Sequence, residues 1–143
     1  MSAVRSLGAE EREALVAVAD ALCGGGRLPA PSETPGYEEW LDRALAARAD
    51  AFEAVVATAV GMAGLTLEGR REALRLLDSR DRPRFHALSS VVAGAWLLVP
   101  EISDALGYPG QVAAPAAFDE AATQLETGIL DPVIERGPFH REV

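Results

Sequence analysis

The chain has 143 residues and a mass of 15.1 kDa, which suits a single domain whose core needs neither a disulfide nor a metal ion. Its 13 basic and 22 acidic residues give a net charge of −9, which argues against a nucleic acid or an anionic membrane as partner. All of the basic residues are arginine, and the lack of lysine and asparagine excludes Schiff-base chemistry, a P-loop lysine and an asparagine-dependent triad.

Helical periodicity is the main signal in the first two-thirds of the chain. A first helix is expected from Ala9 to Cys23, with Glu10 and Glu11 in its first turn and three glycines directly after its end. The segment from Arg27 to Gly36 contains three prolines and is expected to form neither a helix nor a central strand. Further helices are expected at about Tyr37–Ala49, Ala51–Ala63 and Leu67–Leu77.

A fifth helix is expected to lie at the centre of the bundle. Asp81 and Pro83 mark its start, because proline fits the first turn of a helix, and it should end near Val99. It is apolar on nearly its whole circumference, so we expect its large side chains to be almost inaccessible to solvent. These side chains are Leu88, Val92 and Trp96. The apolar stretch is shorter than the roughly 20 residues of a membrane-spanning helix.

The composition changes after this helix. A short helix is expected from Glu101 to Leu106, closed by Gly107, and one last helix at about Asp119–Glu126. Prolines and a glycine are expected to break the chain beyond it; these are Pro132, Gly137 and Pro138. The predicted fold class is all-α. One domain over 1–143 would consist of a compact bundle of about five helices plus a short helix, over about 7–107, and a proline-containing C-terminal arm, over about 108–143.

Few residues are candidates for catalysis. His86 precedes Ser89 and Ser90 at helical spacing, which could be drawn as a base beside a nucleophile, but no orienting acid or oxyanion site accompanies them. A core or interface histidine is the favoured interpretation. Glu101 and Asp104 are spaced as a carboxylate pair, and we expect them to be solvated on a short surface helix.

Metal and phosphate sites are not predicted. Two histidines and one cysteine are too few for a structural zinc site, and Cys23, at a helix C-terminus, is interpreted as a small buried hydrophobe. The three glycines after the first helix follow a helix and not a strand, so they lack the context of a phosphate-binding loop. One basic cluster stands out: Arg70, Arg71, Arg75, Arg80, Arg82 and Arg84. It is either a solvated face with ion pairs or a contact with a carboxylate-rich partner.

The C-terminal arm is too apolar to remain in solvent without a partner. We predict that it contacts a partner through Tyr108, Pro109, Phe118, Leu130, Val133, Ile134 and Phe139. Its prolines prevent one long helix that would hide these side chains, and they lower the entropy lost on binding. The alternative, that the arm packs on its own helical core, stays open.

The order of segments resembles the gluconate 2-dehydrogenase subunit 3 family over roughly Leu7 to Gln111. The resemblance rests on Leu7-Gly-Ala-Glu-Glu-Arg-Glu-Ala-Leu, on the proline loop leading to Gly36-Tyr-Glu-Glu-Trp-Leu, and on Pro100-Glu-Ile-Ser-Asp-Ala-Leu-Gly-Tyr-Pro-Gly-Gln. It implies a small, non-catalytic subunit in a hetero-oligomer with a large FAD-dependent oxidoreductase of the glucose–methanol–choline type. That partner would hold the FAD and oxidise sugars, glycosides or alcohols.

Two features depart from this family. Exported members carry a twin-arginine signal, whereas this chain has only Arg5 near its start and no secretory signal, so a cytoplasmic complex is expected. The segment after Gln111 extends beyond the matched region. Two other functions stay open: a small stand-alone enzyme that uses His86 or Tyr108 as an acid or base, and a helical ligand-binding module.

Overall fold

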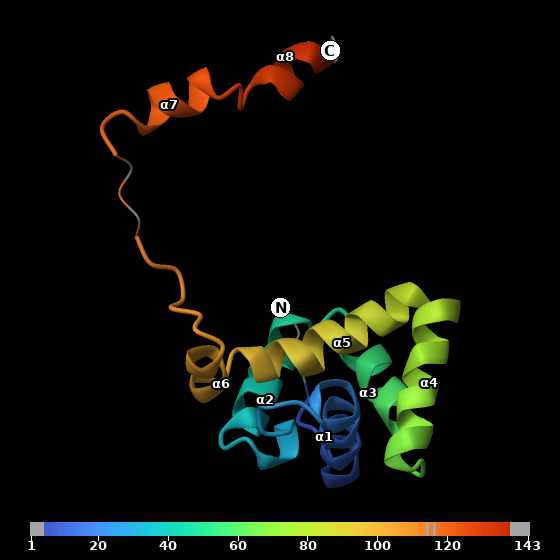
Figure 1. The fold of residues 1–143 in the computed structure, drawn as a ribbon. Helices are drawn as coiled ribbons and strands as arrows, with labels where there is room; N and C mark the ends of the chain where they lie inside the picture. The colour runs from blue at the N-terminus through green and yellow to red at the C-terminus, as the bar shows by residue number, and fades with distance from the viewer. Residues whose placement is uncertain (1–4, 114, 116, 138–143) are drawn as a thin grey trace. The chain divides into compact units, whose positions relative to one another are not determined.

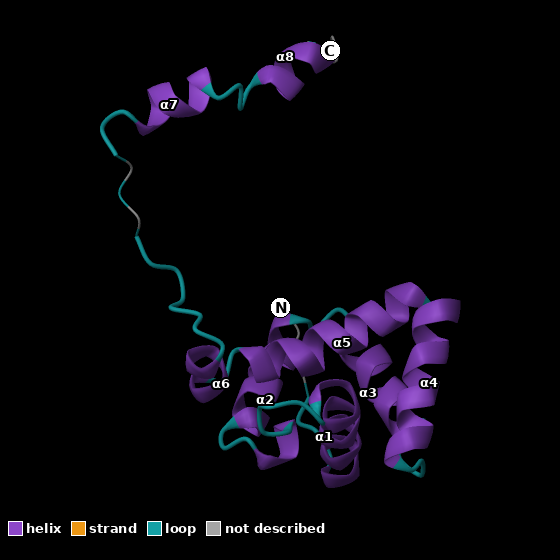
Figure 2. Ribbon diagram, viewed as in Figure 1, coloured by secondary structure: helices purple, strands orange, loops and turns teal. Residues whose placement is uncertain are grey.

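The computed structural model describes residues 5–113, 115 and 117–137, and within these ranges it is all-helical, with no strand. This confirms the predicted fold class (Figure 2). Its elements are α1 (Ala9–Cys23), the 3₁₀ turn η1 (Pro31–Glu33), α2 (Tyr37–Ala47), α3 (Phe52–Val60), α4 (Leu67–Arg80), α5 (Arg82–Leu97), α6 (Pro100–Ala105), α7 (Glu120–Glu126) and α8 (Asp131–Arg136). The chain divides into two units, one up to Gly110 and one from Gln111 onward.

Helix α5 is the centre of the first unit. It packs against α1, α2, α3, α4 and α6, and Figure 1 shows it crossing the bundle above α1 and α3. Leu88 and Val92 are 0% exposed and Trp96 is 8% exposed, which confirms the predicted central position. The apolar circumference of α5 explains this position, because a helix with apolar side chains on most sides must be covered on most sides.

Two buried hydrogen bonds fix the proline loop and α2 to this central helix. The Trp96 indole Nε1 donates to Thr34 Oγ1 at 3.2 Å, and the Thr34 hydroxyl donates to the Ala30 carbonyl oxygen at 2.8 Å. The Tyr37 hydroxyl donates to the backbone oxygen of Val92 at 3.1 Å. Each polar group that α5 buries in this region therefore has a partner, which avoids the cost of a buried unsatisfied donor.

Side-chain hydrogen bonds cap the N-termini of α4 and α5. Thr66 Oγ1 accepts a hydrogen bond from the Gly69 amide at 3.1 Å, and Asp81 Oδ1 accepts one from the Arg84 amide at 3.2 Å. Helix α4 continues to Arg80, three residues beyond its predicted end, so that Asp81 alone separates it from α5. The two helices thus meet at a tight corner, which lies far from the α6 end of the bundle in Figure 1.

Several predicted boundaries were wrong. Helices α2 and α3 are shorter than expected, and the proline loop contains the turn η1, which begins at Pro31. The segment containing Pro132 is also helical, as α8, although it was expected to be broken. In both cases the proline occupies the first turn, where its missing N–H has no helical partner to lose.

The second unit contains two short helices joined by a glycine. The Gly128 amide donates to the Leu125 oxygen at 3.1 Å, and the Ile129 amide donates to the Gln124 oxygen at 3.2 Å. This pair of bonds is a Schellman motif, and it requires the positive φ of 77° that Gly128 adopts. None of the described side chains in this unit is buried. Across the described part of the chain, no helix has the length and apolarity needed to cross a bilayer.

Candidate partner-binding site

The first part of the predicted binding site lies at the end of α6. The Gly107 amide donates to the Asp104 oxygen and the Tyr108 amide to the Ser103 oxygen, both at 2.9 Å. This is a second Schellman motif, with Gly107 at a φ of 71°, and Pro109 follows where the helix can no longer continue. The Leu-Gly-Tyr-Pro-Gly sequence therefore forms a tight stop that leaves Tyr108 and Pro109 exposed, Tyr108 by 57%.

Further apolar side chains surround this stop. Leu97, Leu98 and Leu106 are between 46% and 54% exposed. The Ser103 hydroxyl donates to the Leu97 oxygen at 2.7 Å, while the Ser103 carbonyl accepts from Tyr108, so one residue links the end of α5 to the chain after α6. We call the surface formed by Leu97, Leu98, Leu106 and Tyr108 the apolar corner.

The second part of the predicted site lies in the second unit. Phe118 is fully exposed, and Leu130, the N-cap residue of α8, is exposed together with Val133 and Ile134 of α8, by 44% to 71%. These three side chains are spaced i, i+3 and i+4, so they lie on one side of the helix. We call them the arm face. Phe139, the last predicted contact residue, lies outside the described residues.

His86 is exposed on α5, so a position in the core was wrong, whereas the other half of that interpretation, an interface histidine, stays a prediction. The neighbouring hydroxyls do not form a nucleophile–base pair with it, because Ser89 donates to the His86 backbone oxygen at 3.3 Å and Ser90 to the Ala87 oxygen at 3.1 Å. Nor does the fold bring His86 to Tyr108. About 16 Å of helix separates His86 from Leu97, at the usual rise per residue, and Tyr108 lies at the Leu97 end.

The remaining candidates for chemistry are ordinary surface or packing residues. Glu101 and Asp104 are exposed, as predicted. Cys23 is half-buried beside the core, and burial, followed by the charge of Asp20, raises the pKa of its thiol to about 11, so the unreactive thiol form dominates at neutral pH. Among the described residues, no three His, Cys, Asp or Glu side chains gather in a way that would hold a metal ion.

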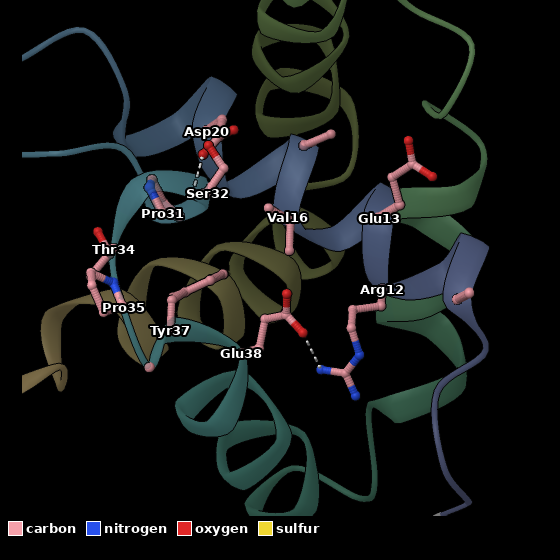
Figure 3. A pocket seen from close by; sticks show the side chains of 13 residues that line it. Arg12, Glu13, Val16, Asp20, Pro31, Ser32, Thr34, Pro35, Tyr37 and Glu38 are labelled. Atoms are coloured by element: carbon pink, nitrogen blue, oxygen red, sulfur yellow. Dashed lines mark hydrogen bonds and ion pairs between the residues drawn. The ribbon is translucent and has the colours of Figure 1, made fainter.

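A groove that sequence reasoning missed lies between α1, η1 and the start of α2 (Figure 3). Its volume is about 750 Å³, and Val16, Pro31 and Tyr37 contribute to its lining. Arg12 lies at one end, where its guanidinium contacts Glu38 Oε2 at 3.6 Å and Asp42 Oδ1 at 2.9 Å. The groove is lined by two segments that lie about 20 residues apart in the sequence, so the pattern of neither segment alone predicts it.

Several polar groups of the groove already have partners within the chain. Asp20 Oδ1 accepts a hydrogen bond from the Ser32 amide at 2.9 Å. The Tyr37 hydroxyl points into the core, where it donates to Val92, and burial raises its pKa well above the usual range. With its hydroxyl held in this way, Tyr37 contributes ring surface to the groove and no acid or base.

Comparison with known proteins finds no family model, no curated protein sequence and no solved structure that matches this chain. The resemblance to the gluconate 2-dehydrogenase subunit 3 family stays a prediction from the sequence.

Proposed function

We propose that this chain is an accessory subunit that binds and stabilises a large FAD-dependent oxidoreductase of the glucose–methanol–choline type. The partner holds the FAD, acts on sugars, glycosides or alcohols, and forms a cytoplasmic hetero-oligomer with this chain. The kind of partner is inferred from the family resemblance. The exposed apolar residues of the arm are the surface that we expect to bind it.

The observation that carries the proposal is the exposure of the arm face. Large aliphatic side chains on one side of a short helix leave apolar surface in water, and burying it against another protein is favourable by about 25 cal/mol per Å². A helix of six residues is too short to be stable by itself in water, so a surface that packs against it also stabilises it. The arm face thus has the properties of an anchor for a groove on a larger protein.

Purification of the tagged full-length chain from its native host tests the proposal. We expect a large flavin-containing protein to be retained with it, seen as flavin absorbance in the eluate and as an oxidase or dehydrogenase activity on sugars or alcohols. If the wild-type chain retains no flavoprotein, the proposal is wrong.

A pair of double variants tests the role of the arm face. Val133→Gln/Ile134→Gln places polar groups on it, whereas Val60→Gln/Leu76→Gln alters two apolar residues of the first unit that are 45% and 42% exposed. We expect the arm variant to reduce flavoprotein retention about tenfold or more, as loss of interface anchors does, and the control variant to retain it. Equal retention by the two variants would contradict the proposed role.

The same pair distinguishes the other interpretation of the arm. If the arm packs on its own core, Val133→Gln/Ile134→Gln lowers the melting temperature of the isolated chain. If the arm binds the flavoprotein, the isolated chain melts as the wild type does, and only retention of the partner is lost.

A further inference from the structure

The charges of this chain are unevenly distributed along its sequence. The stretch from Arg70 to Arg84, which covers most of α4 and the start of α5, contains six arginines and three carboxylates. The rest of the chain contains seven arginines and nineteen carboxylates. Because the protein is so acidic, the contacts of each arginine in this cationic segment indicate whether it stabilises the fold or is available to a partner.

Four of the six arginines make contacts within the first unit, and three of these lie along α4. Arg70 is 91% buried and donates to a backbone oxygen of the preceding turn at 2.9 Å. Arg71 donates to the Gly24 oxygen at 3.4 Å, at the C-terminal end of α1, where a cation is favourable. Arg75 pairs with Glu72 at 3.0 Å. Arg71 and Arg75 form ion pairs, as the interpretation of a solvated face with ion pairs predicts, whereas Arg70 is buried and bonds to a backbone oxygen.

The other three arginines cluster at the corner between α4 and α5, and we call Arg80, Arg82 and Arg84 the arginine elbow. All three are exposed. Arg84 donates from its Nε to Thr58 Oγ1 at 2.8 Å, whereas Arg80 and Arg82 form no hydrogen bond or ion pair with the part of the chain that the structure describes. Asp81, between Arg80 and Arg82, caps α5 through the Arg84 amide, and its single negative charge does not balance the three positive charges of the elbow.

Two of these arginines occupy unfavourable positions. Arg82 and Arg84 lie in the first turn of α5, where the positive end of the helix dipole disfavours a cation and favours a carboxylate. Arg84 has a compensating hydrogen bond to Thr58, whereas Arg82 has no such contact with the described residues, and a residue that conflicts with its local position in this way is typical of a functional surface. Arg80, in the last turn of α4, is favourably placed and adds a third positive charge to the same corner.

We propose that the arginine elbow docks onto a carboxylate-rich patch on the surface of the partner flavoprotein. This inference rests on the proposed function and adds a second, electrostatic contact to the apolar arm. Guanidinium groups suit carboxylates because they form paired, charge-assisted hydrogen bonds. The strongly acidic remainder of the chain disfavours a polyanion such as nucleic acid, and it also makes two copies of this chain repel each other.

The elbow acts on the rate and orientation of association. Complementary charges on two protein surfaces attract them before contact and exclude wrong orientations, whereas apolar anchors determine how slowly the complex dissociates. The elbow therefore guides the flavoprotein onto the chain, and the arm face retains it.

Arg82→Glu in the full-length chain tests the proposal, with Arg27→Glu as its control. Arg27 is another exposed arginine that forms no ion pair with the described residues, and it lies on the glycine loop outside the elbow. Both variants change the net charge equally. We expect Arg82→Glu to slow association with the flavoprotein about tenfold at low ionic strength, and less at high salt, whereas Arg27→Glu changes the rate by less than about twofold.

Stability provides a second readout, because a glutamate in the first turn of α5 is favoured by the helix dipole. We expect Arg82→Glu to melt at or slightly above the wild-type temperature while it associates more slowly. A lower melting temperature would make the elbow a structural feature and overturn the proposal.

Equal slowing by Arg82→Glu and Arg27→Glu would show an effect of net charge alone and would also overturn the proposal. So would an elbow-dependent affinity for nucleic acid or for a second copy of the chain that exceeds the affinity for the flavoprotein. If the wild-type chain binds no flavoprotein, the proposed function fails and this inference fails with it. If the wild type binds and the two variants behave alike, only the inference fails.

Discussion

The helical core and the C-terminal arm are built from the same kinds of residue but use them differently. In the core, α5 buries Leu88, its two valines and Trp96 against five other helices. In the arm, α7 and α8 leave comparable side chains in solvent. Helix formation in the core is stabilised by packing of many side chains, whereas the two short arm helices have local hydrogen bonds and a glycine joint. The comparison shows that helical content alone says little about which part of a chain is stable by itself.

The largest difference between the two regions should appear when one aromatic residue is truncated in each. Trp96→Ala removes a buried indole and leaves Thr34 without its donor, so we expect a loss of about 3–5 kcal/mol of unfolding free energy. Phe118→Ala removes a fully exposed ring and should change it by less than about 0.5 kcal/mol. Chemical denaturation of the isolated chain measures both. A similar loss for Phe118→Ala would show that the arm packs on the core.

A smaller difference in the free energy of unfolding is expected between alanine substitutions at the two glycines of the Schellman motifs. Gly107 and Gly128 both have positive φ, so alanine is strained at each position by about 1 kcal/mol. Helix α6 is anchored in the core through buried Ile102, and Gly107→Ala should therefore lower the free energy of global unfolding by about this amount. Gly128→Ala should destabilise the turn between α7 and α8 and leave the free energy of unfolding of the core unchanged. Thermal unfolding followed by circular dichroism tests both variants, and equal destabilisation would contradict the separation of core and arm.

The smallest expected effect is a pH dependence of stability that arises at the N-terminal edge of the core. Hydrogen bonds from the Arg5 guanidinium, then from the Gly8 amide, lower the pKa of Glu11 from 4.5 to about 2. The ionised form is therefore favoured in the folded state. The stability that it contributes is present above about pH 4.5 and is lost as the pH falls toward 2. We expect melting temperature to fall less steeply over this range in Glu11→Gln than in the wild type. Parallel profiles would show that the contact with Arg5 does not hold in solution.

The core was largely predictable from sequence because its signals are local and periodic. The bounds of α1 match the prediction, since Glu10 and Glu11 mark one end and three glycines the other. Asp81 and Pro83 located the start of α5 for the same reason. The extra turn of α4 was not predicted, because its last residues are polar and carry no apolar period.

Two of the errors have a common physical cause in proline. The sequence predicts breaks at Pro31 and Pro132, but each lies in the first turn of a helix, where proline costs no hydrogen bond. The position of His86 was missed for a different reason. The apolar circumference of α5 predicted burial on nearly all sides, but His86 is exposed near the N-terminal end of the helix.

The exposure of the predicted contact residues was predictable from sequence, whereas their contact with a partner stays a prediction and their geometry was not predictable. The exposure of Tyr108, Phe118, Leu130, Val133 and Ile134 agrees with the prediction of a binding arm, because no core of their own is large enough to cover them. Sequence alone did not reveal that Ser103 links Leu97 to Tyr108, or that only some of the six clustered arginines are available to a partner. Both depend on hydrogen bonds between separate elements.

The placement of the two tryptophans has a spectroscopic consequence. Trp96 is enclosed in the core with its Nε1 bonded to Thr34, so its emission should be shifted to short wavelength and should respond when the proline loop detaches. Trp40 is half-buried on α2, with the Arg43 guanidinium 4.7 Å from its ring centroid. No tryptophan or tyrosine lies beyond Tyr108. Intrinsic fluorescence will therefore follow the melting of the helical core and remain insensitive to ordering of the arm, which requires a dye or an introduced tryptophan to be seen.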